Sequence, residues 1–342
     1  MGQIKIKRRL FMESSGCDWE ARAVSNPSVL KDGEVEHMFY RAIAKNGISS
    51  VGYAKIIRGE IERFDEPVLF STEDYESKGI EDPRVTKVGG CYYLLYTAFD
   101  GKDARIAYAV SKNLRDWKKK GIISPNISVS EARRLVKIKK YRDNWKRYQD
   151  SHGSSVLLWD KDAVLFPEKI DGNFVMLHRF LPDIQIVKFK NFLKLKSDDF
   201  WRDYIVNLSE AEDKISLYRR YGWESEHIGT GAVPIKTKEG WLLIYHAAEL
   251  QRKDISSNSL DRVYHTGAAL LNLKKPEMEI ARLKEPLFSP KYNWEKNGEI
   301  SNVVFPEGAV VDGNKLKIYY GCSDSRIGLA ELSLKELMKR FK

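Results

Sequence analysis

One pattern of apolar and polar positions recurs five times along the chain. Each copy starts with a turn containing Gly and continues as a short apolar strand that ends in aromatic residues or His, before a polar or small residue. The copies are DGEVEHMFYRA (32–42), GGCYYLLYTA (89–98), DGNFVMLHRF (171–180), EGWLLIYHAA (239–248) and DGNKLKIYYGC (312–322). A second apolar segment follows each copy, at 49–56, 104–111, 183–189, 262–273 and 325–332. Gly suits the turn and aromatic or β-branched runs suit strands, so the pattern predicts five strand pairs.

The strand ends of the five copies fall at equivalent positions, which are Arg41, Thr97, Arg179, His246 and Gly321. Successive ends are separated by 56 to 82 residues. Small sheets repeated at such intervals are typical of a β-propeller. We therefore expect an all-β fold, a five-bladed β-propeller with short helical insertions. A β-sandwich of unrelated hairpins is the alternative, but a sandwich of this length needs two domains, and no linker is evident.

We expect residues 1–342 to form a single propeller domain. The blade-like repeats are expected near 32–57, 89–121, 171–190, 239–273 and 312–332. Two segments with helical spacing of apolar residues, 128–149 and 190–220, flank the third copy and are expected to be helical insertions. The last residues, 333–342, have the pattern of a short amphipathic helix with Ser333 as its N-cap.

Three residues just past the strand tips are cationic or can become so: Arg41, Arg179 and His246. Equivalent positions in propeller blades converge on the central axis. Together these residues would form an axial pocket for an anionic ligand. Alternatively, each Arg pairs with a nearby carboxylate.

Composition and charge narrow the class of protein. The chain has 342 residues, of which 42% are hydrophobic and 31% charged, as in soluble globular proteins, which excludes a disordered chain. Only 3 cysteines occur, without a metal-ligand spacing, and no apolar run reaches the length of a membrane span. We therefore expect a cytoplasmic protein with no bound metal and no contact with a membrane.

The formal net charge is +10, and one segment, 131–147, carries 8 Lys or Arg against 2 acidic residues. Such a run is usually a solvated face, and it also suits a surface insertion or an oligomer contact. A basic chain can bind nucleic acid, but no RNA-binding signature is present. We expect no nucleic-acid partner, whereas a homo-oligomer is left open.

The segment Gly79–Arg84 reads GIEDPR and carries the strongest candidate for chemistry. Pro83 disfavours helix at Asp82, so the acidic pair should lie in a turn or an extended segment entering a strand. Asp82 could then project into the axial pocket, where an apolar environment would raise its pKa and suit a general acid. The alternative is a turn carboxylate that accepts hydrogen bonds from backbone N–H groups.

Three further segments precede copies of the repeat or follow them. They are DKDAVLFP (160–167), WESEHIGTG (223–231) and SNVVFPEG (301–308), the last together with Asp324. Their charged residues could line the pocket, and Asn302 and Asp324 would suit sugar hydroxyls. The alternatives are ion pairs on loops and capping turns. No P-loop, HExxH or Ser-His-Asp motif is present.

These segments, in this order, resemble glycoside hydrolase family 130, the β-mannoside phosphorylases and related mannosidases. The resemblance spans roughly residues 20–335 and rests on specific strings in register. They are NPS (26–28), FYRA (39–42), GIEDPRVTK (79–87), YYLLYTAFDG (92–101), KDAVLFPEKIDGNFVMLHR (161–179), GWLLIYHA (240–247), GAALLNL (267–273) and NVVFPEGAVVDGNKLKIYYGCSD (302–324).

The resemblance implies an inverting single displacement on a β-mannoside, with inorganic phosphate as cosubstrate, no other cofactor and α-mannose 1-phosphate as product. Asp82 would be the general acid, passing its proton to the leaving oxygen through a mannose hydroxyl. The phosphate would be bound by Arg179, His246, His227 and Lys161. The mannoside would be bound by Asn26, Arg41, Glu81, Arg84, Asp100, Asp162 and Asp324.

Hydrolysis and binding alone are the alternatives to phosphorolysis. Many family phosphorylases carry a basic residue and Asn where this chain has Trp159 and Asp160, and often Lys in place of His227. An inverting hydrolase would need a second carboxylate as base, for which Glu226 and Glu224 are candidates. A noncatalytic carbohydrate-binding propeller would lack the acid, which is present here. The linkage (β-1,4 or β-1,2) and the acceptor are not distinguished by the sequence.

Overall fold

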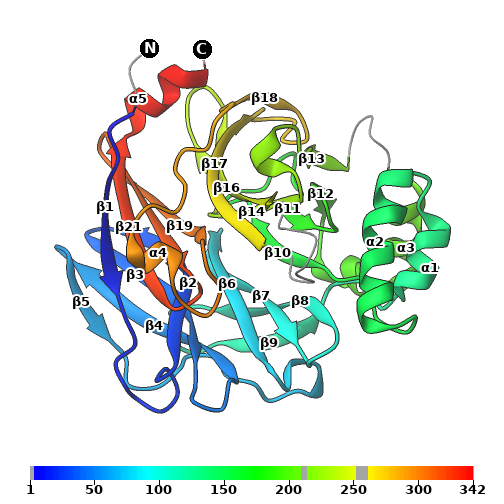
Figure 1. Ribbon diagram of the computed structural model, residues 1–342, viewed down its shortest axis with the longest axis horizontal. Helices are drawn as coiled ribbons and strands as arrows, with labels where there is room; N and C mark the ends of the chain where they lie inside the picture. Colours follow the sequence, from blue (N-terminus) through cyan, green and yellow to red (C-terminus); the bar gives the residue numbers. More distant parts are fainter. Residues whose placement is uncertain (1–3, 209–213, 252–260, 342) are drawn as a thin grey trace.

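The computed structural model describes residues 4–208, 214–251 and 261–341, and it shows an all-β protein with a few short helices (Figure 1). The described strands pair into four sheets. Parts of the expected 190–220 insertion, the 239–273 repeat and the 333–342 helix lie outside the described residues, at 209–213, 252–260 and 342.

The largest sheet has eight strands and joins two four-stranded antiparallel units. The first unit consists of β2 (Ala23–Asp32), β3 (Val35–Ile43), β4 (Ser49–Ile57) and β5 (Glu60–Arg63). The second consists of β6 (Gly79–Val88), β7 (Cys91–Phe99), β8 (Ala104–Ser111) and β9 (Lys118–Ile122). A parallel pair between Ser49 and Gly79 joins the units. The five expected repeats therefore appear as four sheets, since this pair merges the first two.

Three smaller sheets complete the fold. One consists of β10 (Lys161–Leu165), β11 (Phe174–Arg179), β12 (Ile184–Phe189) and β13 (Ile215–Leu217). The next consists of β14 (His227–Thr230), β15 (Ile235–Lys236), β16 (Trp241–Gln251), β17 (Asp261–Leu271) and β18 (Glu279–Arg282). The last consists of β19 (Val304–Asp312), β20 (Lys315–Cys322), β21 (Arg326–Ser333) and β1 (Lys7–Met12). Because β1 pairs with β21, the two ends of the chain lie side by side (Figure 1).

The register confirms that the predicted strand ends are equivalent. In each unit the end residue pairs with a residue of the preceding strand. The pairs are Ser25 with Arg41, Glu81 with Thr97, Lys161 with Arg179, Gly229 with His246, and Phe305 with Gly321. The same two strands therefore meet at the same position in all five units.

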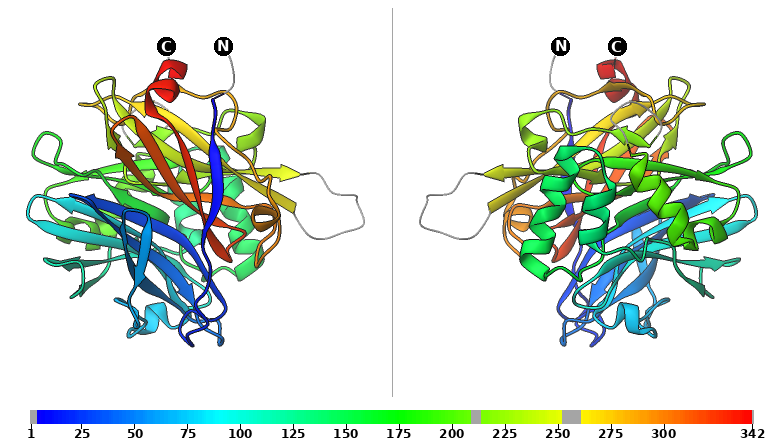
Figure 2. Two further views of the ribbon diagram at one scale, coloured as in Figure 1. Left: turned by 90° about the vertical axis from the view of Figure 1, so that its left-hand side faces the viewer. Right: turned by 90° about the vertical axis from the view of Figure 1, so that its right-hand side faces the viewer.

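The longer helices lie together at one side of the molecule, beyond β10–β13 (Figures 1 and 2). They are α1 (Val129–Leu135), α2 (Lys139–His152) and α3 (Asp198–Val206). Ser128 and Ser197 cap α1 and α3 by accepting backbone N–H bonds. The short elements are η1 (Asp74–Glu76), η2 (Phe192–Lys196), η3 (Gly222–Glu224), α4 (Asn293–Lys296), α5 (Leu334–Met338) and η4 (Lys339–Phe341). Ser333 caps α5, as expected.

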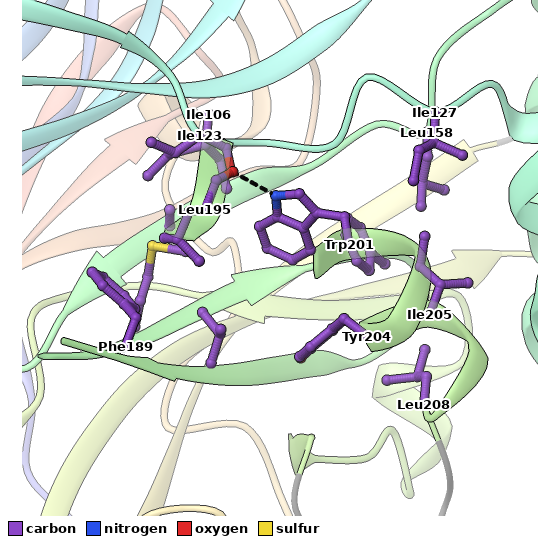
Figure 3. Packing of buried hydrophobic residues seen from close by; sticks show 14 of the residues in the cluster. Ile106, Ile123, Ile127, Leu158, Phe189, Leu195, Trp201, Tyr204, Ile205 and Leu208 are labelled. Atoms are coloured by element: carbon purple, nitrogen blue, oxygen red, sulfur yellow. Dashed lines mark hydrogen bonds between the residues drawn. The ribbon is translucent and has the colours of Figure 1, made fainter. Parts of the chain in front are cut away.

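A hydrophobic cluster around Trp201 fastens α3 to the sheets (Figure 3). The Trp201 indole N–H donates to the carbonyl oxygens of Leu195, at 2.7 Å, and Ile123, at 3.1 Å, so its one polar atom is satisfied within the core. In the part of the chain that the structure describes, none of the helices has the length and apolar character needed to cross a membrane.

Candidate active site

A pocket of about 450 Å³ gathers eight of the predicted site residues. They are Asn26, Arg41, Glu81, Asp82, Lys161, Asp162, Arg179 and Asp324. They come from β2, β3, β6, β10, β11 and the turn after β20, which belong to four of the five units, and Tyr264 of β17 adds a lining residue from the remaining unit. Residues far apart in the sequence thus meet because equivalent strand positions face a common space.

A repeated β-bulge places three of these side chains. Asn26, Asp82 and Asp162 have positive φ angles of 50°, 51° and 58°, and each lies in a one-residue shift of the strand register. Asn and Asp tolerate this left-handed conformation better than other residues with side chains, which explains why they occupy the bulges. Because strained backbone of this kind concentrates at functional sites, the three bulges mark this pocket independently of its charges.

Asp82 lies at the centre of one charged group. Its Oδ1 accepts a hydrogen bond from Asn26 Nδ2 at 2.7 Å, and its carboxyl oxygens lie 3.9 Å from Arg41 and 4.0 Å from Lys161. Glu81 bridges the same two cations, at 2.7 Å from Arg41 and 3.2 Å from Lys161. Burial alone would raise the pKa of Asp82, but Lys161 and Arg41 hold it below its ordinary value. This differs from the raised pKa expected from the sequence, because the sequence does not show how closely the cations approach.

Asp162 is the centre of a second group. Its Oδ2 lies 2.9 Å from Arg179 Nε and 3.6 Å from His246 Nε2. His246 is fully buried and stacks on Phe305 with ring centroids 4.0 Å apart. Burial lowers the pKa of His246 to about 3, so the ring is neutral near pH 7 and not cationic. A neutral imidazole can still donate one hydrogen bond to an anion.

His227 lies behind this group. Its ring contacts those of His246 and Tyr264, and burial lowers its pKa well below the ordinary value. His227 and His246 are both absent from the lining of the open pocket. They therefore back its wall, whereas Lys161 and Arg179 face it.

Arg84 lies beneath the pocket and does not line it. Its guanidinium donates to the carbonyl oxygens of Gly231, Thr230 and Asp82, at 3.0, 3.0 and 3.1 Å, and lies 3.0 Å from the Glu307 carboxyl. Arg84 thus joins β6, β14 and β19 and fixes the carbonyl of the Asp82 bulge. The resemblance placed Arg84 among the substrate-binding residues, but in the structure its side chain is buried and links strands beneath the pocket.

Two carboxyl groups complete the pocket environment. Burial raises the pKa of Asp324 to about 6, and the nearby Asp82 and Glu81 add to this effect. Burial also raises the pKa of Glu307 well above its ordinary value, against the opposing charge of Arg84. Both groups therefore hold protons more readily than an exposed carboxylate does.

Three predicted residues lie away from the pocket. Asp100 accepts bonds from the backbone N–H groups of Lys102 and Asp103 in a turn. Glu224 is fully buried, where it pairs with Arg282 at 3.0 Å and accepts a bond from the Tyr245 hydroxyl. Glu226 accepts a bond from Arg262 at 2.8 Å. The two Glu residues are committed to structural pairs and do not face the pocket as a catalytic base would.

Aromatic residues of the pocket lining were not predicted as site residues. Phe99, Trp159 and Tyr264 line the pocket, and Tyr148 of α2 packs on Trp159 with ring centroids 4.9 Å apart. The first helical insertion thus contacts the pocket lining. Phe99 directly follows the second copy of the repeat (89–98), and this position was a usable signal for it, whereas nothing local to the sequence signals Tyr148.

The pocket has the features of an oxyanion site. Two buried polar atoms beside the pocket, Arg41 Nε and His246 Nδ1, have neither a hydrogen-bond partner nor an ion-pair contact among the described residues. Buried donors of this kind are usually satisfied, so these are free to bind a ligand. Across the described part of the chain, no group of three His, Cys, Asp or Glu side chains is arranged to hold a metal ion.

Comparison with known proteins gives a consistent result. Residues 12–342 match the sequence model of a family described as beta-1,4-mannooligosaccharide phosphorylase. The chain is 38% identical to the 1,2-beta-oligomannan phosphorylase of Thermoanaerobacter sp. (strain X514), over 98% of this chain and 99% of that protein. It is 36% identical to the beta-1,2-mannobiose phosphorylase of the same strain, over 94% and 93%. The solved beta-1,2-mannobiose phosphorylase of Listeria innocua in complex with beta-1,2-mannobiose has the same fold, with a TM-score of 0.72, 21% identity and 99% of each chain covered.

Proposed function

Because the chain belongs to glycoside hydrolase family 130, we propose that it is a β-mannoside phosphorylase. It would transfer a mannosyl group from a β-linked manno-oligosaccharide to inorganic phosphate and release α-mannose 1-phosphate. Phosphate is the cosubstrate, and no metal or organic cofactor takes part.

The observation that carries this proposal is that one pocket is lined both by the Asp82 carboxyl group and by the cationic side chains of Lys161 and Arg179. Attack by a phosphate dianion requires donors that hold its oxygens, and Arg179 and Lys161, which line the pocket, would supply them. His246, buried behind the pocket wall, would add a hydrogen bond from its neutral imidazole. Asp82 would donate the proton that the leaving sugar oxygen requires. Asn26, Arg41 and Asp324 line the same pocket as Asp82 and would bind the mannose hydroxyls.

We propose further that the five units of four or five strands form one five-bladed propeller domain around this pocket. Contacts between inner strands support a ring. Ser28 Oγ of β2 accepts a bond from Val85 N of β6 at 2.9 Å, and Thr86 Oγ of β6 donates to Leu165 O of β10 at 3.4 Å. Thr230 of β14 donates to the Asp162 carbonyl of β10, and Gly308 of β19 packs on β2.

The linkage assigned here is β-1,2, because the relatives at 38% and 36% identity are both named for β-1,2-linked mannans. The acceptor sugar would lie at the mouth, since Arg84 and Glu307 close the pocket below. Phe99 and Trp159 would pack on its ring, and α2 would support them through Tyr148. Hydrolysis has no comparable support, because Glu224 and Glu226 are held in structural ion pairs.

The phosphate dependence of turnover tests this proposal. Arg179→Ala should raise the apparent KM for phosphate at least tenfold and change the KM for mannobiose less. Arg22→Ala is a matched control, because Arg22 lines the rim of the same pocket and pairs with Glu299. Turnover that is independent of phosphate in the wild-type protein would reject the phosphorylase. An unchanged phosphate KM in Arg179→Ala would remove Arg179 from the phosphate site.

A further inference from the structure

The charged groups around the pocket hold no surplus of positive charge for a dianion. Five carboxyl groups lie around Asp82, counting Asp82 itself, against four cations. The carboxyl groups are those of Glu81, Asp82, Asp162, Glu307 and Asp324, and the cations are Arg41, Arg84, Lys161 and Arg179. His246 and His227 are neutral near pH 7, because burial lowers the pKa of each ring.

Each of the cations is already paired. Arg41 and Lys161 share Glu81, Arg84 contacts Glu307, and Arg179 contacts Asp162. At the rim, Arg22 is neutralised by Glu299. Beyond His227, Arg262 and Arg147 share Glu226, and both Arg side chains are partly exposed, at 39% and 50%, so water screens their excess charge.

An anion entering this pocket therefore meets a group of charges that is neutral or negative. Transfer of a dianion from water into a buried site is strongly unfavourable unless charge compensates it. A proton is the one compensating charge that the pocket can take from solvent without a metal ion. Among the residues that the structure describes, no cation lies within 3.5 Å of the lining carboxyl groups of Asp82 and Asp324, so protonating them breaks no close ion pair.

We propose that the phosphate dianion enters together with one proton, which the protein takes from solvent onto the Asp82 and Asp324 carboxyl pair. The proposal rests on the proposed function, and proton uptake would convert the ionised Asp82 into the protonated general acid. In the empty pocket Asp82 is ionised, since Lys161 and Arg41 lower its pKa. Phosphate that contacts those cations cancels their field, so the event that delivers the nucleophile also loads the proton donor.

The reaction then balances. One phosphate oxygen forms a bond to the anomeric carbon of mannose as the glycosidic C–O bond breaks, and the Asp82 proton passes to the leaving oxygen. The acceptor sugar leaves as an alcohol and Asp82 is again a carboxylate. The proton that phosphate carried is lost to solvent from the phosphoryl product, so turnover consumes no net proton.

Calorimetric titration of the protein with sodium sulfate tests the proposal. Sulfate stays a dianion at neutral pH, so a proton taken up on binding must reside on the protein. At pH 7.5, titrations in buffers of different ionisation enthalpy should show uptake of about one proton per sulfate bound. Affinity should fall up to tenfold per pH unit between pH 7 and 8.5. Asp82→Asn should reduce the uptake to less than half and flatten the pH dependence.

Asp171→Asn is the matched control, because Asp171 also has a positive φ of 50° but lies exposed in a turn. It should retain the full uptake. Sulfate binding without proton uptake in the wild-type protein overturns the proposal, and so does undiminished uptake in Asp82→Asn. Phosphorolysis measured on the same preparation separates the two ideas. If mannose 1-phosphate forms but no proton is taken up, the proposed function stands and this inference fails.

Discussion

Asp82 illustrates how a single residue combines strain, hydrogen bonding and charge. It occupies a left-handed bulge, receives the Asn26 amide at 2.7 Å and lies about equally far from Arg41 and Lys161. Asn26 and Asp162 occupy the matching bulges of two other units. The repeat thus supplies one backbone geometry three times, and the three positions carry an amide side chain in one unit and carboxylates in the other two.

Replacing Asp82 tests the acid. Asp82→Asn keeps a side chain that tolerates positive φ but cannot donate the carboxylic proton, so kcat should fall by roughly 10²–10⁴-fold. Circular dichroism and thermal unfolding should match the wild type. Asp171→Asn should keep full activity, since it makes the same change at another left-handed position. Near wild-type turnover in Asp82→Asn would remove Asp82 from catalysis.

Asp324 links the site to stability. Its pKa is raised from 3.8 to about 6, so the folded protein binds this proton more tightly than the unfolded chain. The stability it contributes is complete below about pH 4 and is lost as the pH rises through about 6. The free energy of unfolding of Asp324→Asn, relative to wild type, should therefore be higher at pH 7.5 than at pH 4 by roughly 2 kcal/mol. A difference that does not change with pH in urea titrations would contradict this assignment.

At the scale of the strand, Gly321 makes room for the site. It occupies the position that Arg41 and Arg179 hold in their units, and a Cβ there would collide with Asn26 Oδ1. Gly321→Ala should displace Asn26 from Asp82 and lower kcat more than tenfold, with a smaller change in phosphate KM. Gly90→Ala serves as the control, because a Cβ added at Gly90 would have no other atom within 4 Å. Equal kinetics of the two variants would show that Asn26 does not position the acid.

The inner strands are held together by Arg84. Arg84→Gln leaves Glu307 and the carbonyls of Thr230 and Gly231 without their donor. The free energy of unfolding should therefore be about 3–5 kcal/mol lower than in the wild type. Arg22→Gln, which breaks the pair with Glu299 at the pocket rim, should lower the free energy of unfolding by less than about 1 kcal/mol. Adding Glu307→Gln to Arg84→Gln should recover part of the loss, because it removes the unpaired carboxyl. Equal urea midpoints of unfolding for Arg84→Gln and Arg22→Gln would contradict the conclusion that Arg84 stabilises the fold by linking β6, β14 and β19.

At the scale of the whole molecule, the sequence predicted the features that follow from its repeating pattern of apolar and polar residues. The five strand pairs and the equivalence of Arg41, Arg179 and His246 followed from local patterns, and the register confirms that equivalence. Contacts between residues far apart in the chain could not be predicted from the sequence. The ionised state of Asp82 depends on Lys161, which lies 79 residues away in the chain, and the burial of Arg84 depends on carbonyls of β14. Nor did the sequence show that Glu224 forms an ion pair with Arg282 and Glu226 forms one with Arg262.

The order of the strands also explains why the ends of the chain matter. β1 comes from the N-terminus and pairs with β21 near the C-terminus, so the last sheet is completed by the first strand. This pairing joins the first and last strands in one sheet, and the pocket is lined by residues from all five units. The site is thus a property of the whole chain and of no single segment.

The most direct test of phosphorolysis is to incubate the protein with β-1,2-mannobiose, with and without phosphate, and to follow the products by ¹H and ³¹P NMR. We predict α-mannose 1-phosphate and free mannose in equal amounts, formed only when phosphate is present. Two mannoses per disaccharide without phosphate would identify a hydrolase instead. Formation of the β-anomer of mannose 1-phosphate would contradict a single displacement at this pocket.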